Sequence, residues 1–207
     1  MKKATFEAEA RNSKENLQQR FDWFMQWKDS DLDYTRNCVF IDEAGFHINM
    51  RFNYGRSAAG TRARVKTEKL DHLHIQSLEL FTQGTTTAHF IKFINELLDV
   101  MDLDESLKGC YLVLDNASIH KSQPMIRKIE KRGYKLMHLP PYSPELNLIE
   151  QFWALVKRKL KRGRMLAEEN LSSRIADACN QVLISDLYGF ASHSKRQIMD
   201  FYNKTPM

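Results

Sequence analysis

The chain has 207 residues, 43% of them hydrophobic and 11% aromatic, which suits one well-packed core and excludes a disordered or collagen-like protein. No apolar run is long enough to cross a bilayer, and the N-terminus lacks the apolar segment of a secretory signal, so we expect an intracellular protein with no membrane partner. The net charge of +5 is compatible with a polyanionic partner such as nucleic acid.

The first 37 residues are polar but carry a partial apolar stripe, which predicts a helix that leads into the first strand. The stripe consists of Leu17, Phe21, Phe24, Met25 and Trp27. Next, Cys38–Ile41 is a short apolar run that predicts a buried strand, and Asp42 is the first polar residue after it.

A Gly-rich, cationic segment follows, which predicts an exposed loop or hairpin. Its cations are Arg51, Arg56, Arg62, Arg64 and Lys66. Residues 73–81 alternate imperfectly and predict one strand. Residues 84–87 then offer a turn and an N-cap, and the helical spacing of the apolar residues from Phe90 to Met101 predicts an amphipathic helix.

The second half of the chain alternates strands and helices. Tyr111–Leu114 predicts a second buried strand, which ends at Asp115, and a basic helix over residues 123–132 and a third strand over residues 134–139 follow. Ser143 and Pro144 are a good N-cap and first helical residue for a helix that carries Glu150 beside its apolar stripe. Two more helices are expected over residues 167–184 and 186–203. This alternation predicts an α/β layer with parallel strands.

Asp42, Asp115 and Glu150 are candidate metal ligands, because functional side chains in α/β sheets collect just past the ends of neighbouring strands. Each acid alone has an ordinary structural explanation, the Asp residues as turn formers and the Glu as a partner of the helix dipole. Three carboxylates together would repel one another without a cation, and an oxygen ligand set suits Mg²⁺ or Mn²⁺. Two such ions would support phosphodiester chemistry.

Three segments resemble the DDE transposases of the mariner superfamily, including pogo-like members and bacterial insertion-sequence relatives. They are Val39–Phe46 (VFIDEAGF), Leu112–His120 (LVLDNASIH) and Leu139–Trp153 (LPPYSPELNLIEQFW). The 34 residues between Asp115 and Glu150 are a spacing typical of that superfamily, and residues 84–90 (GTTTAHF) resemble its link into the first core helix. The resemblance spans about residues 36–165.

The resemblance implies an RNase H-like α/β fold, a mixed sheet flanked by helices, over residues 38–165. Residues 1–37 would then be a helical linker, and residues 166–207 would be C-terminal helices packed on the same domain. It also implies roles for particular residues. Asp42, Asp115 and Glu150 would be catalytic and would bind two Mg²⁺ or Mn²⁺ ions, and Asn116 and His120 would support the loop after Asp115 by hydrogen bonds.

The implied reaction is hydrolytic cleavage of double-stranded DNA at transposon ends, followed by attack of the freed 3′-hydroxyl on target DNA. A homodimer is compatible with that role, as is a nuclear location if the host is eukaryotic. The cations at residues 51–66, with Lys157, Arg158, Lys161 and Arg162, are candidate phosphate contacts. Their ordinary explanation is a solvated face.

Two departures from the family pattern bear on activity. The 72 residues between Asp42 and Asp115 are few for the family, which predicts an incomplete hairpin of the second and third strands between Lys66 and Phe81. The chain also begins too late to contain the N-terminal helix-turn-helix region of family members. An alternative function is therefore a catalytically inactive, transposase-derived remnant that binds DNA or protein. A third is an unrelated RNase H-like nuclease that acts on RNA or on RNA–DNA hybrids, which the Pro-Pro-Tyr-Ser-Pro sequence at residues 140–144 and the 34-residue spacing disfavour.

Overall fold

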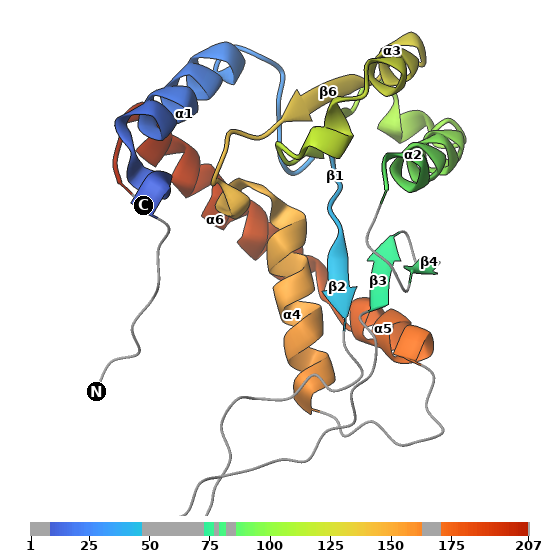
Figure 1. Ribbon diagram of the computed structural model, residues 1–207. Coiled ribbons are helices and arrows are strands. Elements are labelled where there is room, and N and C mark those ends of the chain that lie inside the picture. The colour runs from blue at the N-terminus through green and yellow to red at the C-terminus, as the bar shows by residue number, and fades with distance from the viewer. Residues whose placement is uncertain (1–8, 47–72, 77–78, 82–85, 163–170, 207) are drawn as a thin grey trace, which may run out of the picture. The chain divides into compact units, whose positions relative to one another are not determined.

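A computed structural model describes residues 9–46, 73–76, 79–81, 86–162 and 171–206 (Figure 1). The chain divides into two compact units. The first comprises Met1–Asp42, Thr86–Gln151 and Ser185–Met207, and the second comprises Glu43–Thr85 and Phe152–Ile184. No helix in the described ranges is both long enough and apolar enough to cross a membrane.

The first unit is built on a parallel sheet. Its strands are β1 (Cys38–Phe40), β5 (Tyr111–Leu114) and β6 (Lys135–His138), in the order β1-β5-β6. Every residue of β5 is buried, as expected for a central strand covered on both faces. Helices α2 (Thr87–Met101) and α3 (Gln123–Lys131) precede and follow β5 along the chain. The predicted parallel strands are therefore confirmed.

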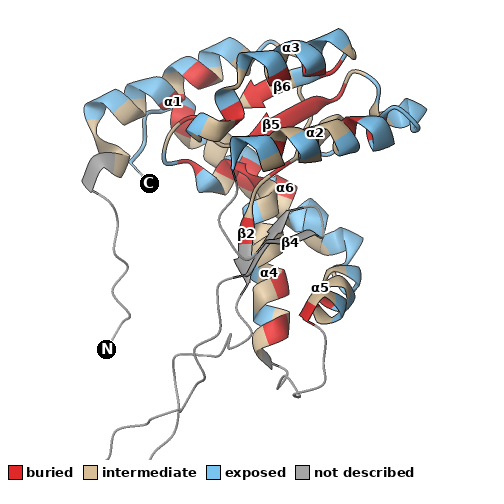
Figure 2. Ribbon diagram, turned by 45° about the vertical axis from the view of Figure 1, so that its right-hand side comes forward, coloured by how far each residue is buried: buried red, intermediate tan, exposed pale blue. Residues whose placement is uncertain are grey.

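Helices cover both faces of this sheet, because alternate residues of β5 enter two different cores (Figure 2). Leu112 and Leu114 pack with α2 and α3, and the buried residues of those helices are Phe90, Ile94, Leu98, Met101, Met125 and Ile129. Tyr111 and Val113 pack on the opposite face with α1 (Lys14–Trp27) and α6 (Ile184–Tyr202). The predicted apolar stripe of the helix at residues 87–101 is confirmed.

Helix α1 is present as predicted, and Phe24 and Trp27 of its predicted stripe pack, partly buried, against the core. The buried residues are Arg20 and Trp23, whereas Met25 of the predicted stripe is 43% exposed. Trp23 sets this orientation: its ring lies edge-on to Phe201 of α6, and its Nε1 donates to the carbonyl of His138 at 3.0 Å. A hydrogen-bonding aromatic residue and a cation are thus buried on this helix beside part of the predicted apolar stripe.

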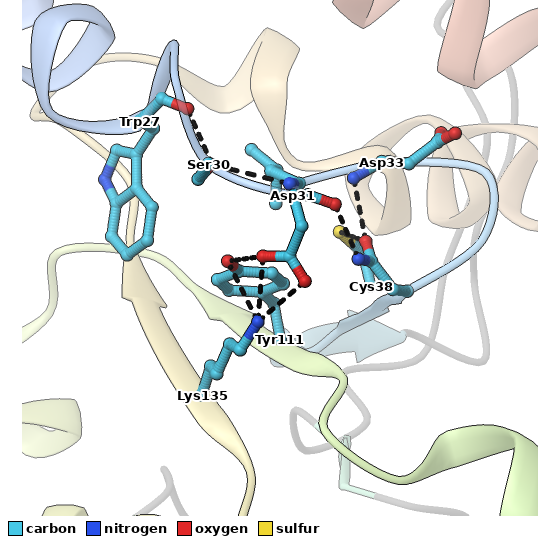
Figure 3. Close-up of polar contacts among 9 residues, drawn as sticks. Trp27, Ser30, Asp31, Asp33, Cys38, Tyr111 and Lys135 are labelled. Atoms are coloured by element: carbon cyan, nitrogen blue, oxygen red, sulfur yellow. Dashed lines mark hydrogen bonds and ion pairs between the residues drawn. The ribbon is translucent and has the colours of Figure 1, made fainter.

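The connection between α1 and β1 is fastened to the amino ends of the central strands (Figure 3). The carboxylate of Asp31 accepts hydrogen bonds from the Tyr111 hydroxyl and, at 2.8 Å, from Lys135 Nζ. The side-chain amide of Asn37 spans the same connection, donating to the carbonyl of Asp31 at 2.8 Å and accepting from the amide N–H of Asp33 at 2.7 Å. These contacts occupy the edge of the sheet opposite to the one where β1 and β5 end.

The second unit contains an antiparallel sheet of β2 (Ala44–Phe46), β3 (Leu73–Gln76) and β4 (Glu79–Phe81), in that order. It also contains most of α4 (Leu148–Arg162) and α5 (Leu171–Asn180), whose core includes Val156, Leu160, Leu171 and Ile175. The prediction of one strand over residues 73–81 is wrong. Both strands of the hairpin are present, though short, and the imperfect alternation reflects two antiparallel strands instead of one.

Four short 3₁₀ helices complete the described elements. They are η1 (Glu9–Asn12), η2 (Glu105–Leu107), η3 (Ser118–Lys121) and η4 (Pro144–Leu146). Two of them belong to the segments of interest, since η3 follows Asp115 and η4 precedes α4. The C-terminal helices begin near the predicted positions, with α6 starting at Ile184.

Candidate active site

Asp42 and Asp115 follow neighbouring parallel strands at equivalent positions. Phe40 of β1 pairs with Val113 of β5, and each Asp is two residues beyond that pair. The bond from the amide N–H of Ile41 to the carbonyl of Val113, at 3.0 Å, extends the pairing past the end of β1. Because neighbouring strands are about 4.8 Å apart, this register brings the backbones of the two acids to one edge of the sheet. Both residues are half-buried.

Asp115 is held through one of its two carboxylate oxygens. Oδ1 accepts from the amide N–H of Ala117 at 2.9 Å and lies 2.6 Å from Nδ1 of His120. The hydrogen bond from His120 is the main cause that lowers the pKa of Asp115, and partial burial acts in the opposite direction. Within the described part of the chain, Oδ2 has no protein partner, so Asp115 retains a free anionic oxygen.

His120 is fully buried in η3, and its ring lies 4.3 Å from the ring of Phe90 of α2. An imidazole packed in this way has little rotational freedom, so it fixes the side chain of Asp115. Asn116, the other residue predicted to support this loop, is exposed, and its side chain makes no hydrogen bond with any part of the chain that the structure describes. Its supporting role stays a prediction.

His138 was not among the sequence candidates, although it is the last residue of β6. Its Nδ1 lies 3.3 Å from the carbonyl oxygen of Asp115, and burial lowers the pKa of its imidazole. The available signal was its position, because His138 ends β6 just as Asp42 and Asp115 follow β1 and β5. His138 therefore braces the backbone on the side of Asp115 away from β1.

Glu150 lies in the first turn of α4 and is exposed, and its amide N–H donates to the carbonyl of Asn147 at 3.0 Å. Among the described residues, no three His, Cys, Asp or Glu side chains lie close enough together to hold one metal ion. The structure thus brings Asp42 and Asp115 to one sheet edge, and the convergence of Glu150 with them stays a prediction.

The start of the helix that carries Glu150 differs from the prediction. Ser143 and Pro144 begin η4, and α4 itself begins at Leu148. Ser143 makes no capping hydrogen bond, because its hydroxyl donates to the carbonyl of Pro141 at 3.1 Å and accepts from Arg20. The predicted N-cap at Ser143 is therefore wrong for α4.

The predicted phosphate contacts lie mainly outside the described residues. These are Arg51, Arg56, Arg62, Arg64 and Lys66, and the side chain of Arg162 is likewise outside. Lys157, Arg158 and Lys161 lie on α4 in the second unit, where Arg158 is exposed and the two lysines are half-buried. These three cations therefore remain candidates for contact with an anionic partner.

The donor set at the sheet edge fits a hard divalent cation. Mg²⁺ is usually bound through one or two carboxylates and keeps several waters. The carboxylates of Asp42 and Asp115 are therefore ligands of the right type and number. Zinc would favour His or Cys ligands. The free cysteines Cys38 and Cys110 do not belong to this edge: Cys38 begins β1, and Cys110 directly precedes β5.

Comparison with known proteins agrees with this arrangement. Over 39 residues the chain is 46% identical to the human histone-lysine N-methyltransferase SETMAR, a match that spans 19% of this chain and 6% of that protein. The fold is similar to the catalytic domain of Mos1 mariner transposase, with a TM-score of 0.67 and 11% identity over 99% of this chain and 98% of the other. It is also similar to the mariner Mos1 paired-end complex with Mg, with a TM-score of 0.77 and 11% identity over 100% of this chain and 67% of the other.

The predicted RNase H-like α/β fold is confirmed by this similarity, with the mixed sheet present as one parallel and one antiparallel sheet of three strands among the described residues. A sequence profile described as DDE superfamily endonuclease matches residues 37–172, about two thirds of the chain. The matched range contains all three acids. The chain belongs to the DDE superfamily endonucleases.

Proposed function

We propose that this chain is a transposase catalytic domain that cleaves double-stranded DNA at transposon ends and transfers the freed strand to target DNA. The observation that carries the proposal is the pair of acids at one sheet edge, with Asp115 anchored through Oδ1 and free at Oδ2. Asp42, Asp115 and Glu150 would hold Mg²⁺ or Mn²⁺. The paired-end complexes of Mos1 transposase with Mg and with Mn support that choice of ions.

The reaction would proceed in two displacements at phosphorus. In the first, water attacks the phosphodiester and the P–O bond to the 3′-oxygen breaks, which leaves a 5′-phosphate and a free 3′-hydroxyl. In the second, that hydroxyl attacks a target phosphodiester, and the displaced oxygen takes up the proton. The bound metal ions would lower the pKa of the attacking group and stabilise the leaving oxygen. The protein's own part is to hold its carboxylates ionised and fixed, as His120 does for Asp115.

A plasmid assay tests the proposal. The protein is incubated with supercoiled plasmid and either Mg²⁺ or Mn²⁺, and nicked and linear products are measured over time. We expect metal-dependent nicking by the wild type and at least a hundredfold loss in Asp115→Asn, which keeps the size of the side chain but removes its charge. Equal nicking by the two proteins would contradict the proposal.

One observation favours the alternative of an inactive remnant: the described residues do not include a three-ligand group. The same assay separates the two functions. Retarded plasmid migration without nicking, unchanged in Asp115→Asn, would indicate a DNA-binding remnant.

A further inference from the structure

The segment that precedes Glu150 contains an unfavourable backbone conformation. We call residues Leu139–Asn147 the Pro-rich turn. Tyr142 within it has a φ of 54°, in the left-handed region that residues other than glycine occupy only at a cost in free energy. Its side chain is 50% exposed, so burial of the ring offsets little of that cost. Other contacts must therefore hold the turn in this conformation.

Arg20 of α1 supplies the closest of these contacts. Its side chain is buried, 1% exposed, and its Nη2 donates to the carbonyl of Tyr142 at 2.9 Å, while Nε donates to Ser143 Oγ at 3.3 Å. The guanidinium carbon also lies 5.4 Å from the ring centroid of Phe201. A buried cation is costly unless its donors are used, and the planar guanidinium presents its Nε and Nη2 donors in a fixed fork, which the ammonium group of lysine does not. Burial lowers the pKa of Arg20, and the nearby Glu145 opposes that shift.

Two further contacts hold the same turn from both ends of the chain. Arg11 Nη2 pairs with Glu145 Oε2 at 3.1 Å, and the Ser194 hydroxyl of α6 donates to the carbonyl of Glu145 at 2.6 Å. Ser194 in turn accepts from Nε2 of Gln151 at 3.3 Å. Gln151 is the residue after Glu150, so the turn and the first turn of α4 are fastened together.

We infer that Arg20 is a positioning residue for Glu150: it holds the Pro-rich turn in its left-handed conformation and thereby fixes where α4, and the acid in its first turn, begins. The inference rests on the proposed function for its effect on catalysis. A helix transmits a change at its start as a rigid body, and a displacement of about 1 Å at a reacting group can cost roughly a hundredfold in rate. Helix α1 would then contribute to the position of Glu150 in the site.

The test compares Arg20→Met, which keeps length and apolar volume, with Lys14→Met on the exposed surface of the same helix. Hydrogen exchange of the backbone amides of residues 145–151 is measured, with the amides of β5 as an internal reference. We expect at least tenfold faster exchange in Arg20→Met and no change in Lys14→Met. In the plasmid assay, we expect kcat to fall at least tenfold while the apparent affinity for DNA stays within twofold.

A rescue variant separates positioning from general destabilisation. Glycine adopts a φ near 54° without the steric cost, so adding Tyr142→Gly to Arg20→Met should restore most of the exchange protection and of kcat. Absence of rescue would overturn the inference, as would unchanged exchange in a folded Arg20→Met.

Should Arg20→Met fail to fold, Ser143→Ala decides in its place, because it removes one acceptor of Arg20 and leaves the cation buried. At least threefold faster exchange then supports the inference, and unchanged exchange overturns it. A wild type that does not nick DNA would refute the proposed function, whereas the exchange experiment would still decide the role of Arg20.

Discussion

At the scale of single residues, His120 determines the state of Asp115. Its Nδ1 lies 2.6 Å from Asp115 Oδ1, which also accepts from the amide N–H of Ala117, and the imidazole is fully buried. Replacing His120 with Leu keeps the packing on Phe90 but removes the donor. We expect the free energy of unfolding at pH 7 to fall by about 1 kcal/mol, which is below the usual range for a hydrogen bond to a charged group because Asp115 is half exposed. Urea unfolding measures this loss.

The same variant should change the pH dependence of stability. A folded-state pKa below the unfolded value of about 3.9 gives a stabilisation that is present above that value and is lost as the pH falls through the folded pKa. In His120→Leu the pKa of Asp115, measured by NMR of its carboxyl carbon, should rise. Ser118→Ala, at an exposed residue of η3, is the matched control and should leave both quantities unchanged. An unaltered pKa in His120→Leu would refute this account.

The sequence could predict the residues whose positions depend on local patterns, but not those positioned by long-range contacts. Asp42 and Asp115 were predictable, because a polar residue directly after a short apolar strand has one available place in a parallel sheet. Arg20 was not, since a cation on a helix is ordinarily solvated and nothing local indicates that two acceptors lie 122 and 123 residues away in the chain. Long-range polar contacts carry no periodicity for a sequence pattern to detect.

At the scale of elements, the connection between α1 and β1 makes the free energy of unfolding depend on pH below about 4. Hydrogen bonds from Thr35, and a contact with Lys195 of α6, lower the pKa of Asp33 to about 2. The stabilisation that ionised Asp33 gives the folded state is complete above the unfolded pKa of about 3.9 and is lost as the pH falls through 2. The variant Asp33→Asn keeps an oxygen acceptor but cannot titrate. We expect the stability difference between wild type and Asp33→Asn to shrink between pH 5 and about 2, measured by urea unfolding at each pH. A difference constant over that range would contradict the assignment.

The cationic part of α4 leads to a prediction about DNA binding. Arg158 and Lys161 are available without disturbing the buried residues Val156 and Leu160. Each phosphate contact contributes about 0.9 to the slope of log K against log salt for duplex DNA. The double variant Arg158→Ala/Lys161→Ala should therefore lower the magnitude of that slope by up to about 1.8, measured by fluorescence anisotropy. Lys92→Ala, which removes a cation paired with Glu96 on α2, should leave it unchanged. An equal slope in the double variant would remove these residues from the DNA-binding surface.

Helix and strand positions were predicted better than their ends. The apolar spacing of α2 defined that helix, because periodic burial is the property that stabilises it. The start of α4 was mistaken by several residues, because Ser143 uses its hydroxyl for Pro141 and Arg20 instead of the helix. A capping residue is a local signal, and here tertiary hydrogen bonds outweigh it.

At the scale of the whole molecule, the candidate ligands come from segments separated by 72 and 34 residues, and all three belong to the first compact unit. Two of them follow the neighbouring strands β1 and β5, and the third lies in α4. The division between the units falls directly after Asp42 and directly after Gln151, so two of the three acids lie at its boundary. Sequence alone could predict the α/β class and the positions of Asp42 and Asp115 after neighbouring strands, but it could not predict that the chain passes into a second unit directly after Asp42 and Gln151.

The position of Asp42 and Asp115 at one sheet edge predicts that divalent cations stabilise the first unit even without DNA. A ligand at a hundredfold excess over its dissociation constant adds about 2.7 kcal/mol to the free energy of unfolding. We therefore expect Mn²⁺ in the millimolar range to raise the thermal midpoint of the wild type. Asp42→Asn and Asp115→Asn should each abolish that rise, since each removes a charged oxygen ligand. Glu150→Gln tests the third acid separately: an abolished rise would mean that Glu150 reaches the ion before DNA binds, and an unchanged rise would mean that the sheet edge binds the ion alone. Asp29→Asn, which alters an exposed carboxylate paired with Lys28, is the control for the loss of one negative charge. A rise of equal size in Asp115→Asn would show that the ions bind elsewhere, and the metal-dependent function would then have no support at this edge.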